Sequence, residues 1–308
     1  MRFPKGKFII LTSNNFKEIN LSSKILLYYL ILFFAFLIFT SGILSSILAY
    51  YDKKKIENEI SNLNQQKEFI SNQYNKVSKE ISNLIKENRE KNNLKSIVKK
   101  LNPNVNQEFL DLWTDIIYEN KNSIEEYLNP WSKIQLTYAE SPFSLEPGSS
   151  IVLAVVAIES NFNTDLISKK GAMGIFQIIS DTADELGLKN PWNPSENTLG
   201  GIKYLTYLLK RFNKYNDQIH LTFASYNAGP TRVINEWMPT WGDSWSLIFE
   251  GLSSEKSYRE TREYSILAYQ LTALFVSGEW ANKDEYFWIN YKNNILAESK
   301  DNYFSLVF

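Results

Sequence analysis

Glu159 is the residue whose place in the sequence most suggests chemistry. It directly follows the uncharged segment IVLAVVAI at 151–158. A helix that is apolar on every face is buried, and carboxylates are seldom buried without a partner. Glu159 either reaches the surface or a cationic partner, or it lines a cleft whose apolar wall raises its pKa. In the second case it would remain protonated near neutral pH and serve as a general acid.

The composition restricts the other chemistries that the chain could use. The 308 residues contain no cysteine and a single histidine, His220. Disulfides, thiolate metal sites and a cysteine nucleophile are thereby excluded, and a His-rich metal site or a Ser-His-Asp triad is not expected. Hydrolytic or lyase chemistry would therefore depend on carboxylates, and we expect no metal and no cofactor. The net charge of -1 shows no basic footprint for nucleic acid.

Several short motifs occur in the same order as in a known family and with similar spacing. They are Ala157–Asn163 with the pair Glu159-Ser160, Gly171–Gln177, Asn197–Leu205, Ser225–Pro230 and Glu260–Tyr264. Over residues 140–275 the chain resembles the soluble-lytic-transglycosylase type of the lysozyme-like superfamily. Two positions depart from the pattern: Phe176 stands where the family usually has Met, and Ser225 where it usually has Ala.

The resemblance implies an all-α lysozyme-like domain that cleaves peptidoglycan with one carboxylic acid. Glu159 would protonate the oxygen between N-acetylmuramic acid and N-acetylglucosamine, and would then take the proton of the sugar's own C6 hydroxyl, which closes a 1,6-anhydro ring. The implied substrate-binding residues are Ser160, Gly174, Phe176, Gln177, Tyr226, Asn227 and Tyr264. Gln177 and Asn227 would bond the sugar's polar groups, the tyrosines would orient Glu159 or stack on sugars, and Phe176 could wall a sugar site.

Two other functions are compatible with these residues. A muramidase-type hydrolase would use the same fold with water as the nucleophile. A glycan-binding or scaffolding protein of the cell envelope would have the fold with little or no catalysis.

Residues 25–51 carry no charge, and about 20 such residues in a helix cross a bilayer. The segment is too long for the apolar core of a signal peptide and lacks a good cleavage site, so we expect a retained transmembrane helix. The lysine and arginine counts on its two sides nearly tie and favour only slightly a cytoplasmic segment at 1–24. The cleavage of peptidoglycan, which lies outside the inner membrane of bacteria, would place the catalytic domain on the periplasmic or cell-wall side.

A helical spacer is predicted over residues 52–102, because apolar residues recur there with a heptad period. The apolar positions are Ile56, Ile60, Leu63, Ile70, Tyr74, Val77, Ile81 and Leu84, with Lys67 and Asn88 at the polar seam positions. This pattern favours a coiled coil and a homodimer formed through residues 56–88. A single amphipathic helix folded back on its own domain, or a partly disordered linker, would also explain it. Asn102-Pro103-Asn104 is typical of a helix end.

The fold class is therefore mainly α, with a lysozyme-like domain over 103–285 and a tail at 286–308 to which we assign no role. The apolar spacing from Phe109 to Ile117 indicates an amphipathic helix. Glu146-Pro147-Gly148-Ser149 predicts a turn in which Ser149 caps the apolar helix that follows.

We predict that a fragment beginning near Asp52 forms a dimer, because pairing buries the apolar seam of the spacer. Sedimentation equilibrium measures this directly. A fragment that remains monomeric at high micromolar concentration would show that the heptad pattern does not pair two chains.

Overall fold

The computed structural model describes residues 6–12, 15–21, 23–136, 141–253 and 258–296. The chain divides into two compact units, Met1–Glu80 and Ile81–Phe308. We call the second unit the helical domain.

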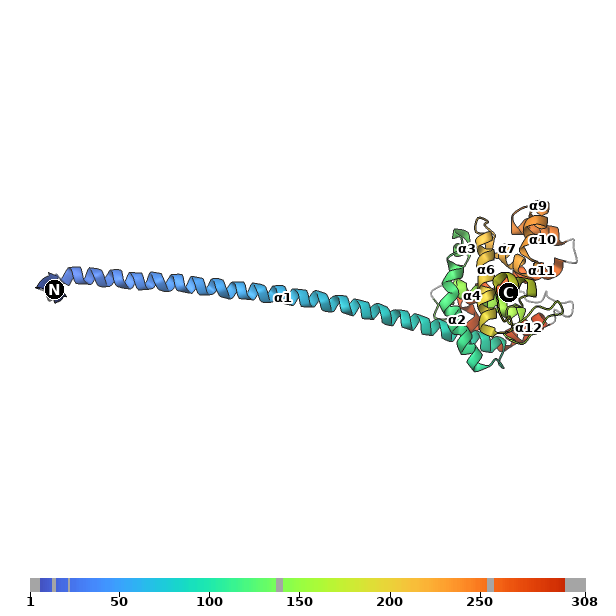
Figure 1. The fold of residues 1–308 in the computed structure, drawn as a ribbon, viewed down its shortest axis with the longest axis horizontal. Coiled ribbons are helices and arrows are strands. Elements are labelled where there is room, and N and C mark those ends of the chain that lie inside the picture. The colour runs from blue at the N-terminus through green and yellow to red at the C-terminus, as the bar shows by residue number, and fades with distance from the viewer. Residues whose placement is uncertain (1–5, 13–14, 22, 137–140, 254–257, 297–308) are drawn as a thin grey trace. The chain divides into compact units, whose positions relative to one another are not determined.

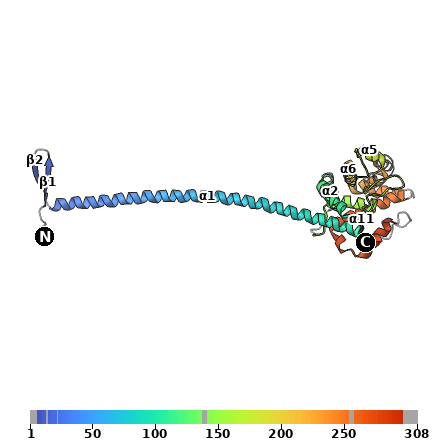
Figure 2. The ribbon, with the colours of Figure 1, turned by 60° about the horizontal axis from the view of Figure 1, so that its bottom comes forward.

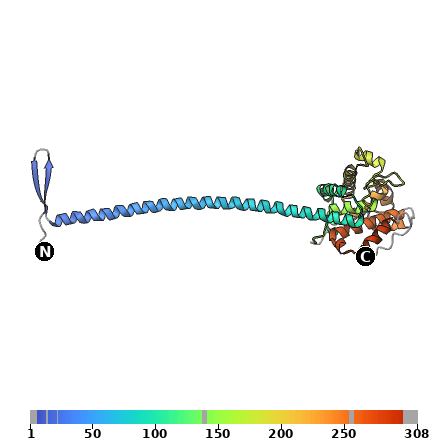
Figure 3. The same cartoon turned by 90° about the horizontal axis from the view of Figure 1, so that it is seen from below.

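The first unit opens with a β-hairpin that the sequence analysis missed. Strands β1 (Gly6–Thr12) and β2 (Asn15–Leu21) are antiparallel, with Gly6 opposite Leu21 and Thr12 opposite Asn15. Figure 2 labels the two strands, and Figure 3 shows them from a second direction. The hairpin occupies much of the predicted segment 1–24, whereas residues 1–5, 13–14 and 22 lie outside the described residues.

Helix α1 (Ser23–Leu101) contains both the apolar segment and the spacer. Among the described residues it is the one helix long and apolar enough to cross a membrane, and its most apolar window is not buried in the protein. The helix ends at Leu101, directly before Asn102-Pro103, which confirms the predicted stop. Because α1 runs through residues 52–101, the prediction of a helical spacer is confirmed. The pairing of two such helices stays a prediction.

The helical domain confirms the predicted all-α class: its described regular elements are helices (Figure 1), with isolated bridges at Met173 to Ile167 and Ile178. In chain order they are α2 (Gln107–Glu125), α3 (Pro130–Gln135), α4 (Pro147–Glu159), α5 (Ser180–Leu186), α6 (Pro194–Arg211), α7 (Gln218–Ala228), α8 (Pro230–Arg232), the π-helix η1 (Val233–Trp237), α9 (Met238–Trp241), α10 (Trp245–Ser253), α11 (Arg259–Ser277), the 3-10 helix η3 (Glu279–Asn282) and α12 (Glu285–Leu296).

Helix α4 is the centre of this domain. Every residue from 148 to 158 is buried, and the helix packs against α2 and α11. At Gly148 the backbone of α2 comes so close that a Cβ atom would lie 2.5 Å from the carbonyl oxygen of Lys121. The prediction that Ser149 caps this helix is wrong. Glu146 is the N-cap, Pro147 fills the first turn, and Ser149 lies inside the helix.

The helical domain extends beyond the predicted boundaries at 103 and 285. Leu94, Ile97 and Leu101, at the end of α1, are at most 2% exposed and belong to the same core cluster as α4. Trp288 of α12 is also part of this cluster, so the predicted tail contributes to the core as far as it is described. Residues 297–308 of that tail lie outside the described residues.

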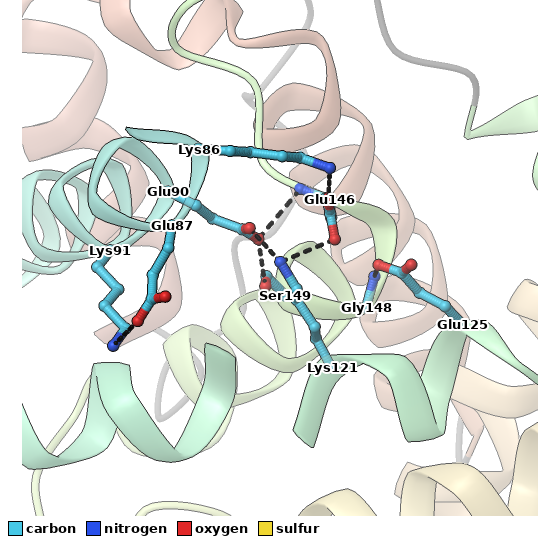
Figure 4. A network of polar contacts seen from close by, with 9 residues as sticks. All are labelled: Lys86, Glu87, Glu90, Lys91, Lys121, Glu125, Glu146, Gly148 and Ser149. Atoms are coloured by element: carbon cyan, nitrogen blue, oxygen red, sulfur yellow. Dashed lines mark hydrogen bonds and ion pairs between the residues drawn. The ribbon is translucent and has the colours of Figure 1, made fainter. Parts of the chain in front are cut away.

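A buried polar network joins the end of α1 to α2 and to the start of α4 (Figure 4). Lys121 of α2 forms ion pairs with Glu90 of α1 and, at 2.8 Å, with Glu146. Glu90 also accepts a hydrogen bond of 2.7 Å from Ser149, and Lys86 pairs with Glu146. Burial by itself would lower the pKa of Lys121, but its hydrogen bonds to the two carboxylates outweigh burial and raise it.

Replacing Lys121 by Met should strongly destabilise the helical domain. The change leaves the buried Glu90 carboxylate without its cation, while Glu146 keeps its ion pair with Lys86. Breaking a buried pair in this way costs about 3–5 kcal/mol. Denaturant unfolding of the full chain in detergent, followed by tryptophan fluorescence, measures the loss in the free energy of unfolding.

Lys95→Met is the matched control. Lys95 also joins α1 to α2, through a 2.6 Å ion pair with Asp111, but that pair is partly exposed and exposed pairs contribute about 1 kcal/mol or less. Equal losses in the two variants would contradict the importance of the buried network.

Candidate active site

The predicted motifs meet at one cavity of about 1060 Å³ in the helical domain. Glu159 at the end of α4 lines it, together with the predicted residues Gln177, Tyr226 and Asn227. Polar and aromatic side chains outside the predicted set also line it: Ser168, Lys169, Lys170, Asp181, Thr182, Glu185, Tyr204, Tyr207, Thr231, Arg259, Glu260 and Glu263.

Glu159 is partly buried and accepts a hydrogen bond of 2.7 Å from the hydroxyl of Tyr264 on α11. Burial raises the pKa of Glu159 to about 7, the hydrogen bond from Tyr264 lowers it, and the charge of Glu260 raises it. No cation among the described residues forms an ion pair with Glu159. Of the two alternatives open at the sequence level, the geometry therefore matches the cleft-lining carboxyl group that is held partly protonated at neutral pH.

The turn that follows Glu159 is held by a set of specific contacts. Ser160, itself buried, donates a hydrogen bond of 2.8 Å to the carbonyl of Ile175. Asn161 and Phe162 then adopt positive φ angles of 46° and 63°, a conformation that is costly for a side chain as large as Phe. The Phe162 ring packs edge-on against Trp113 at 5.3 Å, and Asn102 donates to the carbonyl of Asn161 at 2.9 Å. Ser160 thus acts on the site through the backbone and does not line the cavity.

The loop carrying Gln177 is shaped by a close approach to α6. Gly174 has a φ of +71°, and a Cβ atom there would lie 2.7 Å from the Asn197 amide nitrogen. The buried Asn197 side chain donates to the carbonyl of Met173 at 3.0 Å and accepts from the amide of Phe176 at 2.9 Å. Gly174 therefore makes room for Asn197, and it does not line the cavity.

Phe176 does not have the position that the sequence suggested. Its ring is fully buried against Gly201, where a Cβ atom would lie 2.1 Å from it, so the ring cannot wall a sugar site. Its carbonyl group instead accepts a hydrogen bond of 2.8 Å from the hydroxyl of Tyr226. The expectation failed because an aromatic side chain in a motif can fill the core beneath a loop as readily as it can face a ligand.

Two tyrosines and an asparagine tie α7 and α11 to the site. The Tyr226 and Tyr264 rings are parallel within 6°, with centroids 6.4 Å apart. Burial, with the nearby Glu159, raises the pKa of Tyr226 well above its ordinary value. Tyr264 is 3% exposed, so it contacts Glu159 from inside the core. The Asn227 side chain accepts from Thr261 at 2.6 Å, and its amide is 3.4 Å from Glu260.

Glu260 is the functional candidate that the sequence analysis passed over, although it begins the Glu260–Tyr264 motif. It is exposed and lines the cavity, and its charge acts on Glu159. Asp165, the next acid after Glu159 along the chain, is exposed and is not among the residues lining the cavity. Glu260 is far from Glu159 along the chain and acts on it because α11 packs against α4 in the folded domain. Among the described residues no group of three or more His, Asp or Glu side chains could hold a metal ion.

Comparisons with known proteins support the resemblance found in the sequence. Residues 138–239 match the Transglycosylase SLT domain, which confirms the resemblance for that segment. The membrane-bound lytic murein transglycosylase F of Pseudoalteromonas translucida is 28% identical over 154 residues, covering 46% of this chain and 32% of that protein. The transglycosylase of Enterobacteria phage PRD1 is 36% identical over 95 residues, 31% of this chain and 34% of that protein.

The chain thus spans about a third of the length of these relatives. Among solved structures, the 70 kDa soluble lytic transglycosylase of Escherichia coli is similar, with 22% identity and a TM-score of 0.35. That alignment covers 58% of this chain and 29% of the other.

Proposed function

We propose that this chain is a membrane-anchored lytic transglycosylase that cleaves the β-1,4 bond between N-acetylmuramic acid and N-acetylglucosamine in peptidoglycan. The observation that carries the proposal is Glu159. It is a carboxyl group with a pKa of about 7, at a large cavity lined by residues of several transglycosylase-like motifs.

One group with such a pKa can serve both steps of the reaction. Glu159 in its acid form protonates the glycosidic oxygen as the bond to the muramic C1 breaks, and the acetamido oxygen of the same sugar stabilises the cationic carbon. Glu159, now ionised, accepts the proton of the C6 hydroxyl, whose oxygen forms the new bond to C1. The product is a 1,6-anhydro ring, no water is consumed, and Glu159 returns to its acid form.

The side chains around Glu159 support this cycle. Tyr264 holds one carboxylate oxygen by a 2.7 Å hydrogen bond and so stabilises the ionised form after proton transfer. Gln177 and Asn227 line the cavity. The amide nitrogen of Gln177 donates to the carbonyls of Leu166 and Gly174, so its amide oxygen would accept a hydrogen bond from the sugar. Asn227 would bind the sugar's polar groups beside it. Tyr226 and Ser160 hold the loop that carries Gln177 by hydrogen bonds to the carbonyls of Phe176 and Ile175.

The anchor and the location of the enzyme belong to the same proposal. Residues 25–51 of α1 would span the inner membrane, with residues 1–24 in the cytoplasm. The helical domain would lie on the periplasmic or cell-wall side, because its substrate lies there. The heptad seam at 56–88 would pair two copies beside the membrane. The support for this arrangement is the uncharged length of the segment, the apolar helix and the membrane-bound relatives.

Mass spectrometry of the muropeptides released from purified sacculi tests the reaction. We expect products whose cut ends are lighter than hydrolytic ends by one water molecule, the mark of the anhydro ring. Reducing ends would show a hydrolase instead, and no release would show a binding protein. Glu159→Gln keeps the shape of the side chain but removes the acid, and it should lower the rate by roughly 10²–10⁴. A Glu159→Gln enzyme that cuts normally would contradict the mechanism.

The dependence of activity on pH provides a second test, because two variants should shift the alkaline limb of the profile in opposite directions. The acid form of Glu159 is lost as the pH rises through its pKa of about 7, so activity should fall about tenfold per pH unit above that value. Tyr264→Phe removes the hydrogen bond that lowers this pKa, so the alkaline limb should move to higher pH. Glu260→Gln removes the charge that raises it, so the limb should move to lower pH.

Tyr269→Phe serves as the control for this pair, because Tyr269 lies on the same helix but stacks on His220 at 4.4 Å. The alkaline limb of the Tyr269→Phe profile should stay at the pH of the wild type. Profiles in which Tyr264→Phe and Glu260→Gln move the limb in the same direction would show that Glu159 is not the titrating group.

A further inference from the structure

We propose that the part of the cavity between α5 and α6 is an outer sugar-binding subsite, with the rings of Tyr204 and Tyr207 as its platform and Glu185 as its hydrogen-bond acceptor. The identity of the sugar rests on the proposed function. The existence of the subsite rests on the side chains themselves.

The platform consists of two tyrosines one turn apart on α6. The rings of Tyr204 and Tyr207 lie within 17° of parallel, with centroids 6.3 Å apart, and both line the cavity. Tyr207 is 46% exposed, so its ring is available to a ligand. A tyrosine ring offers an apolar face with a polar edge, which suits the apolar C–H face of a pyranose ring and its hydroxyl rim.

The platform continues the tyrosines of the reaction centre. The Tyr204 ring lies 5.4 Å from that of Tyr226, and Tyr226 and Glu159 line the same cavity. A succession of cavity-lining rings, those of Tyr226, Tyr204 and Tyr207, thus leads from the part of the cavity that Glu159 lines to the exposed Tyr207. A polysaccharide presents an apolar face at each sugar, so it matches such a succession better than a single small ligand does.

Carboxylates from α5 border the same part of the cavity. Asp181 and Glu185 lie one turn apart on this helix, are exposed and line the cavity. Burial raises the pKa of Tyr204 to about 12, and the charges of Tyr207 and Glu185 contribute. Glu185 and Tyr204 line the same cavity. No ion pair or hydrogen bond to another described residue engages Glu185. It is therefore available to accept hydrogen bonds from sugar hydroxyl or amide groups.

Calorimetry with the hexamer of N-acetylglucosamine tests the subsite without turnover, on the full chain in detergent and in the Glu159→Gln background. Tyr207→Ala should weaken hexamer binding about tenfold, and Glu185→Ala should also weaken it. Tyr207→Phe keeps the ring and should bind as the parent does. Trp131→Ala is the matched control, because Trp131 is 57% exposed on α3 and is not among the residues lining the cavity.

Hexamer binding that is unchanged in Tyr207→Ala, or lost to the same degree in Trp131→Ala, would overturn the subsite. The subsite would also be overturned if the Glu159→Gln parent binds no hexamer while the wild type releases anhydro-muropeptides. In that case the proposed function would stand without the subsite. If hexamer binding depends on the Tyr207 ring but the wild type releases no muropeptides, the subsite stands and the proposed function fails.

Discussion

The structure depends on the burial of α4. Residues 148–158 of this helix are buried, so its last residue, Glu159, emerges from an apolar core. Within the described part of the chain, its carboxyl group accepts one hydrogen bond, from Tyr264. A carboxyl group in such a place ionises reluctantly. The pKa of about 7 is therefore a consequence of packing, and the acid-base chemistry that we propose follows from the same packing. A water-filled environment around α4 would remove both.

Both ends of α4 are held by residues at or beyond the end of the long α1 helix. At the start of α4, Glu90 accepts the hydroxyl of Ser149, and Lys121 joins Glu90 to Glu146. At its end, Asn102 binds the carbonyl of Asn161 within the turn after Glu159. The last turns of α1 are thus part of the domain that carries the carboxyl group. A boundary drawn at residue 103 would remove Leu94, Ile97 and Leu101 from the core.

The motifs predicted residues that meet at one cavity, but they did not predict which side chains face it. Glu159, Gln177, Tyr226 and Asn227 all line the cavity, because the spacing of these motifs reflects helices that must meet. Phe176, Gly174 and Ser160 support the site from the core instead. Whether a side chain faces a cavity or the core depends on which atoms lie behind it, such as Gly201 behind Phe176, and a linear pattern does not contain that information.

By itself, the sequence determined the helical class, the uncharged segment at 25–51 and the stop after Leu101, and it singled out Glu159 as the candidate acid. These depend on local composition and on the order of short motifs, which are properties of the chain itself. Only the tertiary structure decided that Tyr264 donates a hydrogen bond to Glu159 and that the charge of Glu260 raises the pKa of Glu159. It also decided that Tyr204 and Tyr207 line the cavity. It also made the end of α1 part of the domain core. Each of these joins residues from separate helices, and their separation is set by packing.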